Sequence, residues 1–342
     1  MPFVFMLAIA GTIIAVKQNQ SQKSSANQIA EISGTMPQVR NPIDTENLAE
    51  VESLGILLLG YGGPGHSGGF LTDVIQVLHI NFAKQRASLI SIPRDLWVTT
   101  QSGHVGKINE AYASSSGVDA AKQMAAQVTG IPIDYFVGID FVGLQRAIGE
   151  NLKGIEVEVS ETLDDPWYPV QGLELETCGM TAEEVAEVSS RLSGFELEKQ
   201  FPCRYERVYF PAGTHHMEGG DVLAFVRSRH GSGSGDFSRS KRQHEVLDAV
   251  VKKMLQIDAF TNSVEFFESL SHTITTDITA KTVLELTPKI LAATEFPKVA
   301  IILSTENVLT TGKSAGGQFV LLPKTGANDW QSTQDFIQAA EN

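Results

Sequence analysis

Basic residues gather in one short stretch of this sequence, and their chemistry suits phosphate. Between Phe225 and Gln243 the chain has a single acid, Asp236. The same stretch holds five basic residues, Arg227, Arg229, Arg239, Lys241 and Arg242. Guanidinium groups match phosphate oxygens in bidentate geometry and stay charged when buried. Because arginine is no general base near neutral pH, the set indicates charge stabilisation in phosphoryl transfer. The alternative is that these arginines cap helix carbonyls and form surface ion pairs.

A second polar group follows an apolar run earlier in the chain. Arg94 and Asp95 come directly after the run at 88–92, and Lys107 and Asn109 follow closely. Ligands of open α/β sheets bind beyond the carboxyl ends of strands, so these residues are candidates for the same site. Asp95 would either accept a proton from an attacking hydroxyl or orient an arginine.

The glycine-rich segment 60–69 fits two known motifs but lacks their context. Residues 60–65 match G-x-G-x-x-G, yet no helix pattern follows to receive a dinucleotide pyrophosphate. Residues 65–69 match G-x-S-x-G, but the preceding strand ends too early for a nucleophile elbow. We interpret the segment as a pliable loop, with a Ser67 nucleophile as the competing enzyme hypothesis.

These candidate residues stand among alternating apolar elements. Strand-length runs occur at 55–59, 74–80, 88–92, 135–139, 155–159, 208–210, 300–303 and 319–322. Helical periodicity occurs at 119–128, 142–149, 220–229, 238–257, 264–271, 282–292 and 329–340. The alternation predicts an α/β fold with a central mixed β-sheet and helices on both faces.

Composition limits the classes of protein. The chain has 342 residues, 42% apolar, with 26 Lys and Arg against 40 Asp and Glu, giving a net charge of −14. This apolar content excludes a disordered chain, and the acidity argues against nucleic acid as a partner. Residues 150–198 hold 13 acids and 2 bases. A polar insert at about 174–204 contains Cys178 and Cys203, which are either bridged or free thiols.

The first residues predict a membrane segment. Residues 2–16 carry no charge, but fifteen helical residues span only about 22 Å of a roughly 30 Å hydrocarbon core. The segment is a signal-peptide core, a clipped transmembrane helix or a buried helix. Residues 17–50 are polar and predict a flexible linker. We therefore expect a single-pass anchor, a linker, a globular domain over 51–325 and a C-terminal helix over 326–342.

Six ordered blocks of sequence resemble the LytR-CpsA-Psr family. They are GILLLGYGGPGHSGGFLTDVIQVLHI, SLISIPRDLWV, GKINEAYA, TGIPIDYFVGIDFVGLQRAIGENLKGIEVEV, FPAGTHHMEGGDVLAFVRSR and DFSRSKRQHEVLDAVVKKML. The resemblance implies an extracytoplasmic α/β/α domain at the bacterial cell membrane. It also implies transfer of a glycopolymer from a polyprenyl-pyrophosphate carrier to peptidoglycan. Pyrophosphate hydrolysis in the lipid, or binding of the lipid without turnover, are the alternatives.

The resemblance also implies roles for individual residues. The residues that would bind the pyrophosphate are Arg94, Arg227, Arg229, Arg239, Arg242 and Gln243. Asp73 matches the second of two family aspartates that hold Mg²⁺ (Mn²⁺ is the alternative), whereas the first falls here at Tyr61. A phenol is a poor ligand for Mg²⁺, so three alternatives remain: Asp73 holds the ion with water and phosphate oxygens, His66 helps to hold a softer ion, or no metal is needed.

Two further patterns have two readings each. The apolar residues in IPIDYFVGIDFVGL either line a groove for the polyprenyl tail or belong to the core. His215 and His216 look like a metal pair, but they occupy a turn before a helix and are interpreted as structural.

Overall fold

A mixed sheet of six strands forms the centre of the computed structural model, which describes residues 51–64, 68–99, 105–228, 236–256 and 274–342. The strand order is β11-β6-β1-β2-β3-β12. β1 runs antiparallel to β2 and parallel to β6, and β3 runs parallel to β12. The six are β1 (Ser53–Tyr61), β2 (Thr72–Asn81), β3 (Arg86–Ser91), β6 (Tyr135–Asp140), β11 (Ile274–Thr276) and β12 (Lys298–Ile302).

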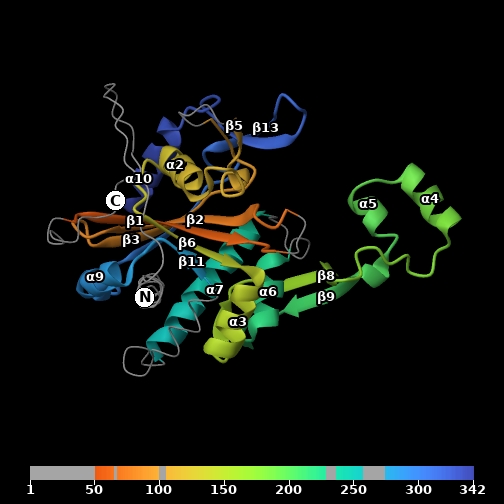
Figure 1. Cartoon of the computed structure of the whole chain (residues 1–342), viewed down its shortest axis with the longest axis horizontal. Helices are drawn as coiled ribbons and strands as arrows, with labels where there is room; N and C mark the ends of the chain where they lie inside the picture. Colours follow the sequence, from red (N-terminus) through yellow and green to blue (C-terminus); the bar gives the residue numbers. More distant parts are fainter. Residues whose placement is uncertain (1–50, 65–67, 100–104, 229–235, 257–273) are drawn as a thin grey trace.

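Helices cover both faces of this sheet because its strands are apolar on both sides. Leu57 and Leu59 of β1 pack with α2 and α10, whereas Ile56 and Leu58 pack with α9 on the opposite face. Figure 1 shows α2 and α10 above the sheet and α7 and α9 below it. The α/β prediction is therefore confirmed. These helices are α2 (Gly117–Thr129), α7 (Asp236–Gln256), α9 (Ala280–Ala293) and α10 (Gln331–Glu341).

A second apolar core lies beside the sheet. The antiparallel pair β7–β10 packs with α6 and α7 and with the helical segment that follows β6. Phe225 of α6 and Val157 of β7 are fully buried in it. The elements are α3 (Phe141–Arg146), the π-helical turn η4 (Ala147–Asn151), β7 (Ile155–Val159), β10 (Gly213–Met217) and α6 (Gly219–Arg227). His215 and His216 lie in the strand β10 and not in a turn as predicted, and His216 pairs with Glu156 across the β7–β10 ribbon, in keeping with a structural role.

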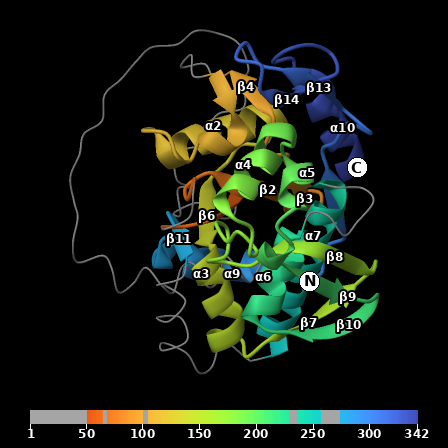
Figure 2. The same ribbon diagram turned by 90° about the vertical axis from the view of Figure 1, so that its right-hand side faces the viewer.

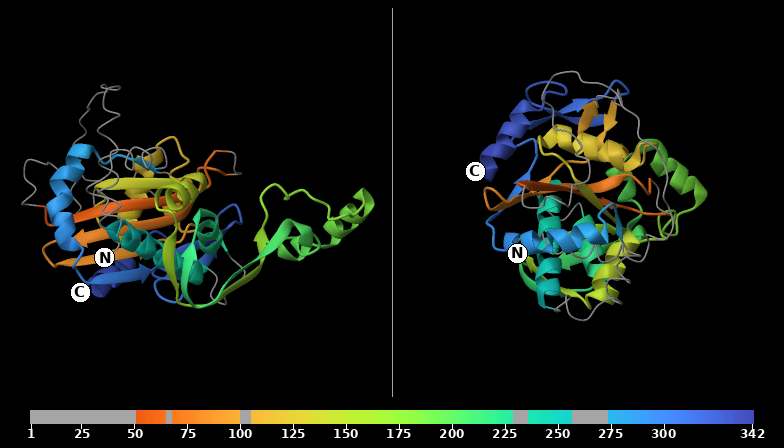
Figure 3. Two further views of the ribbon diagram at one scale, coloured as in Figure 1. Left: turned by 90° about the horizontal axis from the view of Figure 1, so that it is seen from below. Right: turned by 60° about the vertical axis from the view of Figure 1, so that its left-hand side comes forward.

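The predicted insert forms an arm that extends from this body. The antiparallel ribbon of β8 (Leu163–Pro169) and β9 (Tyr205–Phe210) leads into it, and Figures 1 and 3 show it standing apart from the rest. We call residues 170–204 the arm. It contains α4 (Ala182–Arg191), α5 (Phe195–Glu198) and the 3-10 turn η5 (Pro202–Arg204). Cys178 and Cys203 are bridged, with their Cα atoms 5.6 Å apart.

Two small hairpins complete the body at the end that Figure 2 shows with α2 and α10. Trp330 and Ile337 are buried against the same core as α2, so the C-terminal helix is part of the globular body. The hairpins are β4 (Trp97–Thr99) with β5 (Val105–Lys107), and β13 (Leu309–Lys313) with β14 (Phe319–Pro323); the short turn η3 (Ile108–Glu110) follows β5.

Some predicted segments lie outside the described residues. They are the membrane segment 2–16, the linker 17–50 and the helix at 264–271. Among the residues that are described, every helix is too short or too polar to cross a bilayer.

Candidate functional site

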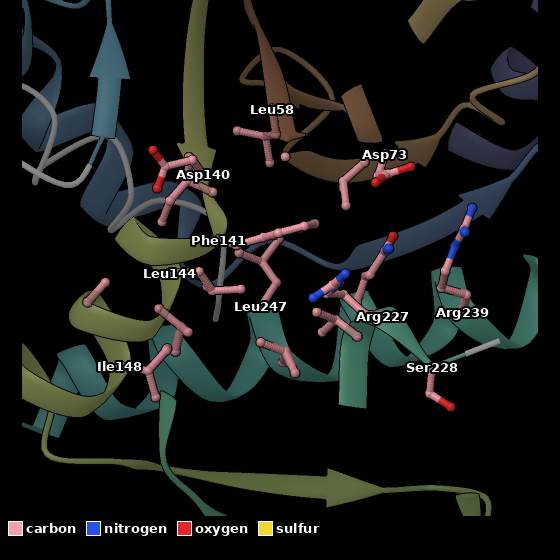
Figure 4. A pocket seen from close by; sticks show the side chains of 18 of the residues that line it. Leu58, Asp73, Asp140, Phe141, Leu144, Ile148, Arg227, Ser228, Arg239 and Leu247 are labelled. Atoms are coloured by element: carbon pink, nitrogen blue, oxygen red, sulfur yellow. The ribbon is translucent and has the colours of Figure 1, made fainter. Parts of the chain in front are cut away.

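A cavity of about 470 Å³ lies between the central sheet and the second core. One side of it is apolar, with Leu144 and Ile148 from α3 and η4 facing Leu247 of α7. Figure 4 shows these side chains toward one end of the cavity, whereas Arg227 and Arg239 point into it further along. An apolar chamber that adjoins Arg227 and Arg239 suits a ligand that has a hydrocarbon part and an anionic part, and three acids, Asp73, Asp140 and Asp165, also line the cavity.

Residues of the apolar segment 131–144 lie partly in the wall of the cavity and partly in the core. Val137 and Ile139 of β6 face the cavity, together with Phe141 of α3. Ile133 and Phe136 instead pack in the core beneath α2. Because side chains alternate along a strand, the segment contributes both to the wall of the cavity and to the core, and its contact with a polyprenyl tail stays a prediction.

Three of the predicted phosphate ligands line the cavity: Arg227 at the end of α6, and Arg239 and Gln243 on α7. The Arg227 guanidinium lies 4.3 Å from the centre of the Phe141 ring, and Arg239 is only 8% exposed. Guanidinium groups held in partly dry surroundings bind phosphate more strongly than exposed ones.

Arg242 holds the end of α6, which carries Arg227, through two hydrogen bonds. Its Nε donates to the carbonyl of Phe225 at 2.8 Å, and its Nη2 donates to the carbonyl of Ser228 at 2.5 Å. These carbonyls stand at the C-terminal end of α6, where the helix leaves such groups without partners. Arg242 therefore anchors the end of the helix that carries Arg227. The sequence allowed both helix capping and phosphate binding, and the capping contacts are the ones formed here.

The arginines on α7 also repel one another. Burial, with the neighbouring Arg239 guanidinium, lowers the pKa of Arg242 to about 10. Both groups stay protonated at neutral pH, so their proximity has an energetic cost that a bound anion would reduce. Glu245 and Asp165 offset part of this repulsion, because their negative charges raise the pKa of Arg242.

The other predicted residues form a cluster behind Asp73, which lines the cavity. Arg94 Nη1 donates to Asp73 Oδ1 at 2.5 Å. Asp95 lies 2.6 Å from Lys107 Nζ and 3.6 Å from Arg94 Nε. Asn109 is buried, and its backbone N–H donates to the Arg94 carbonyl. Asp95 is thus engaged by two cations and does not line the cavity, which favours the orienting role over that of a base.

Tyr61 does not stand in for a metal ligand. Its ring is buried, with the ring centres of Tyr112 and Phe70 at 5.1 and 6.1 Å, and the cavity-facing residue beside it is Gly60. Burial, with the neighbouring Tyr61, raises the pKa of Tyr112, so the Tyr112 phenol is neutral. Neither residue offers a carboxylate to a cation.

The donors that remain do not make a magnesium site. Within the described residues, no three His, Cys, Asp or Glu side chains gather closely enough to hold a metal ion. Asp73 already balances Arg94, and the second acid of the wall, Asp140, accepts from the Gly143 N–H at 2.6 Å as the N-cap of α3. Among the residues that line the cavity, Arg227 and Arg239 carry positive charge beside three acids, Asp73, Asp140 and Asp165.

Sequence reasoning missed two acids of the site. Asp140 ends β6 and starts α3, and its only signal was the turn from strand to helix pattern. Asp165 is 1% exposed and accepts a hydrogen bond from the Ser228 hydroxyl, next to Arg227. Nothing in the acidic stretch 150–198 distinguished Asp165 from its exposed neighbours.

Three predicted residues lie outside the described part of the chain: Arg229, His66 and Ser67. Their proposed contributions remain predictions.

Comparison with known proteins identifies the family. The sequence model of the LytR-CpsA-Psr family matches residues 8–315. This chain belongs to the LytR-CpsA-Psr family. A relative within the group is the polyisoprenyl-teichoic acid–peptidoglycan teichoic acid transferase TagU of Bacillus cereus. It is 23% identical over 260 residues, which are 73% of this chain and 71% of TagU.

Solved structures share the LytR-CpsA-Psr fold with this chain. Bacillus subtilis TagV superposes with a TM-score of 0.55 at 21% identity, covering 85% of this chain and 98% of TagV. TagT bound to LI-WTA gives a TM-score of 0.57 at 20% identity, covering 92% and 98%. These similarities establish a common architecture.

Proposed function

We propose that this protein is a phosphotransferase that moves a glycopolymer from a polyprenyl-pyrophosphate carrier to peptidoglycan. The observation that carries the proposal is the cavity, in which an apolar chamber adjoins Arg227 and Arg239. A polyprenyl tail matches the chamber and a pyrophosphate matches the arginines. The full name of TagU describes transfer of teichoic acid from a polyisoprenyl carrier to peptidoglycan, which is the same class of reaction.

In the proposed reaction, a sugar hydroxyl of peptidoglycan attacks the glycan-side phosphorus. A new P–O bond forms, the bond between that phosphorus and the bridging oxygen breaks, and polyprenyl phosphate leaves. The hydroxyl proton passes to water or to the departing phosphate. Arg227 and Arg239 stabilise the charge that develops on the phosphoryl oxygens, while Arg242 and the Asp73–Arg94 pair hold the wall in position.

We route no step through Mg²⁺ or Mn²⁺, because the donor set at Asp73 does not fit such an ion. Titration of the protein with Mg²⁺ by calorimetry tests this directly, and the expected result is no binding heat at millimolar concentrations. Saturable binding that is lost in Asp73→Asn would restore the expectation drawn from the family resemblance.

We also propose that the domain stands outside the cell membrane, anchored by residues 2–16 through the linker 17–50. The Cys178–Cys203 disulfide supports this placement, since disulfides persist in oxidising compartments. Protease added to intact spheroplasts would then degrade the domain. Protection of the domain until the cells are lysed would contradict the proposal.

The decisive experiment supplies a polyprenyl-pyrophosphate-linked glycan with purified peptidoglycan. Release of polyprenyl phosphate together with glycan bound to peptidoglycan is the expected result. Release without attachment would indicate a hydrolase, and retention of intact lipid would indicate a binding protein.

A further inference from the structure

Aromatic side chains from the base of the arm line the edge of the cavity. They are Trp167 and Tyr168 of β8 and Tyr205 of β9, and we call these three residues the aromatic shelf. None of them has a part in the phosphoryl chemistry described above.

A β-bulge directs the shelf. In the β8–β9 register, Asp165 pairs with Val208 and Tyr168 with Glu206, so Pro166 and Trp167 together oppose one residue. Such a bulge turns a side chain away from the regular alternation of the strand. The backbone N–H of Trp167 donates to Asp165 Oδ1 at 2.9 Å, and the Ser228 hydroxyl donates to the same carboxylate. Hydrogen bonds through Asp165 therefore connect the bulge to Ser228, which follows Arg227 at the end of α6.

The arm supports the shelf from behind. The Trp167 ring packs edge-on against Phe195 at 5.7 Å and against Tyr205 at 5.5 Å between ring centres. The Tyr205 hydroxyl donates to Glu198 Oε2 at 2.5 Å. Phe195 and Glu198 both belong to α5, which the disulfide encloses. Rings fixed in this way lose little freedom when a ligand binds.

The shelf continues the path that a lipid-linked substrate would follow. Arg227 lies 4.3 Å from the ring centre of Phe141, on the side of the apolar chamber, and 6.0 Å from that of Tyr168, on the side of the arm. A ligand with its tail in the chamber and its pyrophosphate at Arg227 would direct its next group toward the shelf.

The chemistry of the shelf suits an uncharged sugar. The rings of Trp167 and Tyr205 can pack against the C–H face of a pyranose, whereas Tyr168 is largely buried in the second core. Nearby cations are already paired: Arg207 is bidentate with Asp164, and Arg204 lies 3.7 Å from Glu198. The shelf thus offers ring stacking in place of a second anion site.

We propose that the aromatic shelf binds the first sugar ring of the carrier-linked glycan, an uncharged pyranose. The inference rests on the proposed function, because it takes the position of the pyrophosphate from it. The arm then serves as a specificity element, presenting the glycan to the acceptor, while the chamber recognises the lipid.

Two soluble lipids distinguish sugar binding at the shelf from lipid binding in the chamber. They are farnesyl pyrophosphate, and farnesyl pyrophosphate carrying one glucose. Calorimetry on the wild-type protein should give about tenfold tighter binding of the glucosylated lipid, the gain that one well-placed aromatic contact provides. Trp167→Leu should remove this difference and leave the affinity for farnesyl pyrophosphate unchanged. Tyr205→Leu carries the same test if Trp167→Leu does not fold, as judged by circular dichroism.

Tyr209→Leu is the matched control, because Tyr209 is an exposed aromatic residue of the same ribbon and does not line the cavity. It should keep the tenfold preference for the glucosylated lipid. A preference that persists in the shelf variants would overturn the shelf and leave the proposed function intact. Failure of the wild-type protein to bind farnesyl pyrophosphate would overturn the proposed function and the shelf with it.

Discussion

Around the cavity, charged side chains are buried and held by their neighbours, whereas in the arm most side chains meet solvent. Arg239, Arg242 and Asp165 are each less than a tenth exposed, but α4 contains no buried residue. The body derives its order from apolar packing on three clusters. The arm has little such packing and relies on a disulfide, a capping box at Thr181 and exposed ion pairs. Substitutions should therefore change chemistry in one region and local order in the other.

The largest expected effect is that of Arg227→Ala. It removes a guanidinium that lines the cavity and binds the phosphates in the proposed reaction, and we expect transfer to fall about 100-fold or more, as for other transition-state donors. Release of polyprenyl phosphate measures the loss. Arg191→Ala, an exposed arginine of α4, is the control and should transfer normally with an unchanged melting temperature. Near-normal transfer by Arg227→Ala would remove this residue from the site.

The second effect concerns acid stability of the body. His244 lies 2.9 Å from the Ser91 hydroxyl, and burial lowers its pKa from 6.5 to about 4. The unfolded chain therefore takes up this proton at higher pH than the folded protein. The free energy of unfolding falls as the pH drops from 6.5 toward 4, by about 3 kcal/mol for this group.

Urea denaturation of the wild-type protein and His244→Gln at pH 7 and pH 4 isolates this contribution. The variant cannot take up the proton, so the difference between the two unfolding free energies should change by about 3 kcal/mol between the two pH values. Parallel pH dependence in both proteins would show that His244 does not carry the effect.

The third effect is confined to the arm. The disulfide joins residues 25 apart in sequence, and its removal should destabilise the arm by about 3 kcal/mol through the entropy of the opened loop. In the double variant Cys178→Ser with Cys203→Ser, limited proteolysis should cut within 170–204. Hydrogen exchange in the central sheet should not change. Faster exchange in β1 and β2 would show that the arm and the body unfold together.

The smallest effect should come from the exposed pair Glu187–Arg191 on α4, in which both side chains are 64% exposed. Glu187→Gln should change the free energy of unfolding by less than about 0.5 kcal/mol, since solvent screens such pairs. Thermal melts suffice to check this. A larger loss would mean that surface charge stabilises the arm more than its geometry indicates.

The same contrast explains what the sequence could predict. Apolar runs located β1, β2, β3, β6 and β7 correctly, because burial on one or both faces leaves a clear pattern. The run LDDPWYP of β8 escaped notice, since its aspartates and prolines argue against a strand, and pairing with β9 overrides them. The sequence also did not predict β10, which is polar, or β4, β5 and β11, which have only three residues each.

Candidate site residues divided in the same way. Arg227 and Arg239 were chosen by residue type, Gln243 and Asp73 by the family resemblance, and all four line the cavity. Sequence spacing did not distinguish Arg242, which anchors α6, from its neighbour Arg239. That distinction depends on which side of α7 faces the end of α6, a property of tertiary packing.

The ribbon at the base of the arm makes the segment between its two strands tolerant of changes in length. Leu163 and Phe210 are paired where β8 and β9 leave the body, so the two ends of the intervening segment are already joined by the fold. Lengthening a loop between fixed ends costs little, because the entropy of closure grows only with the logarithm of its length. The segment between β8 and β9 can therefore change in length at little cost to the fold of the chamber and its arginines.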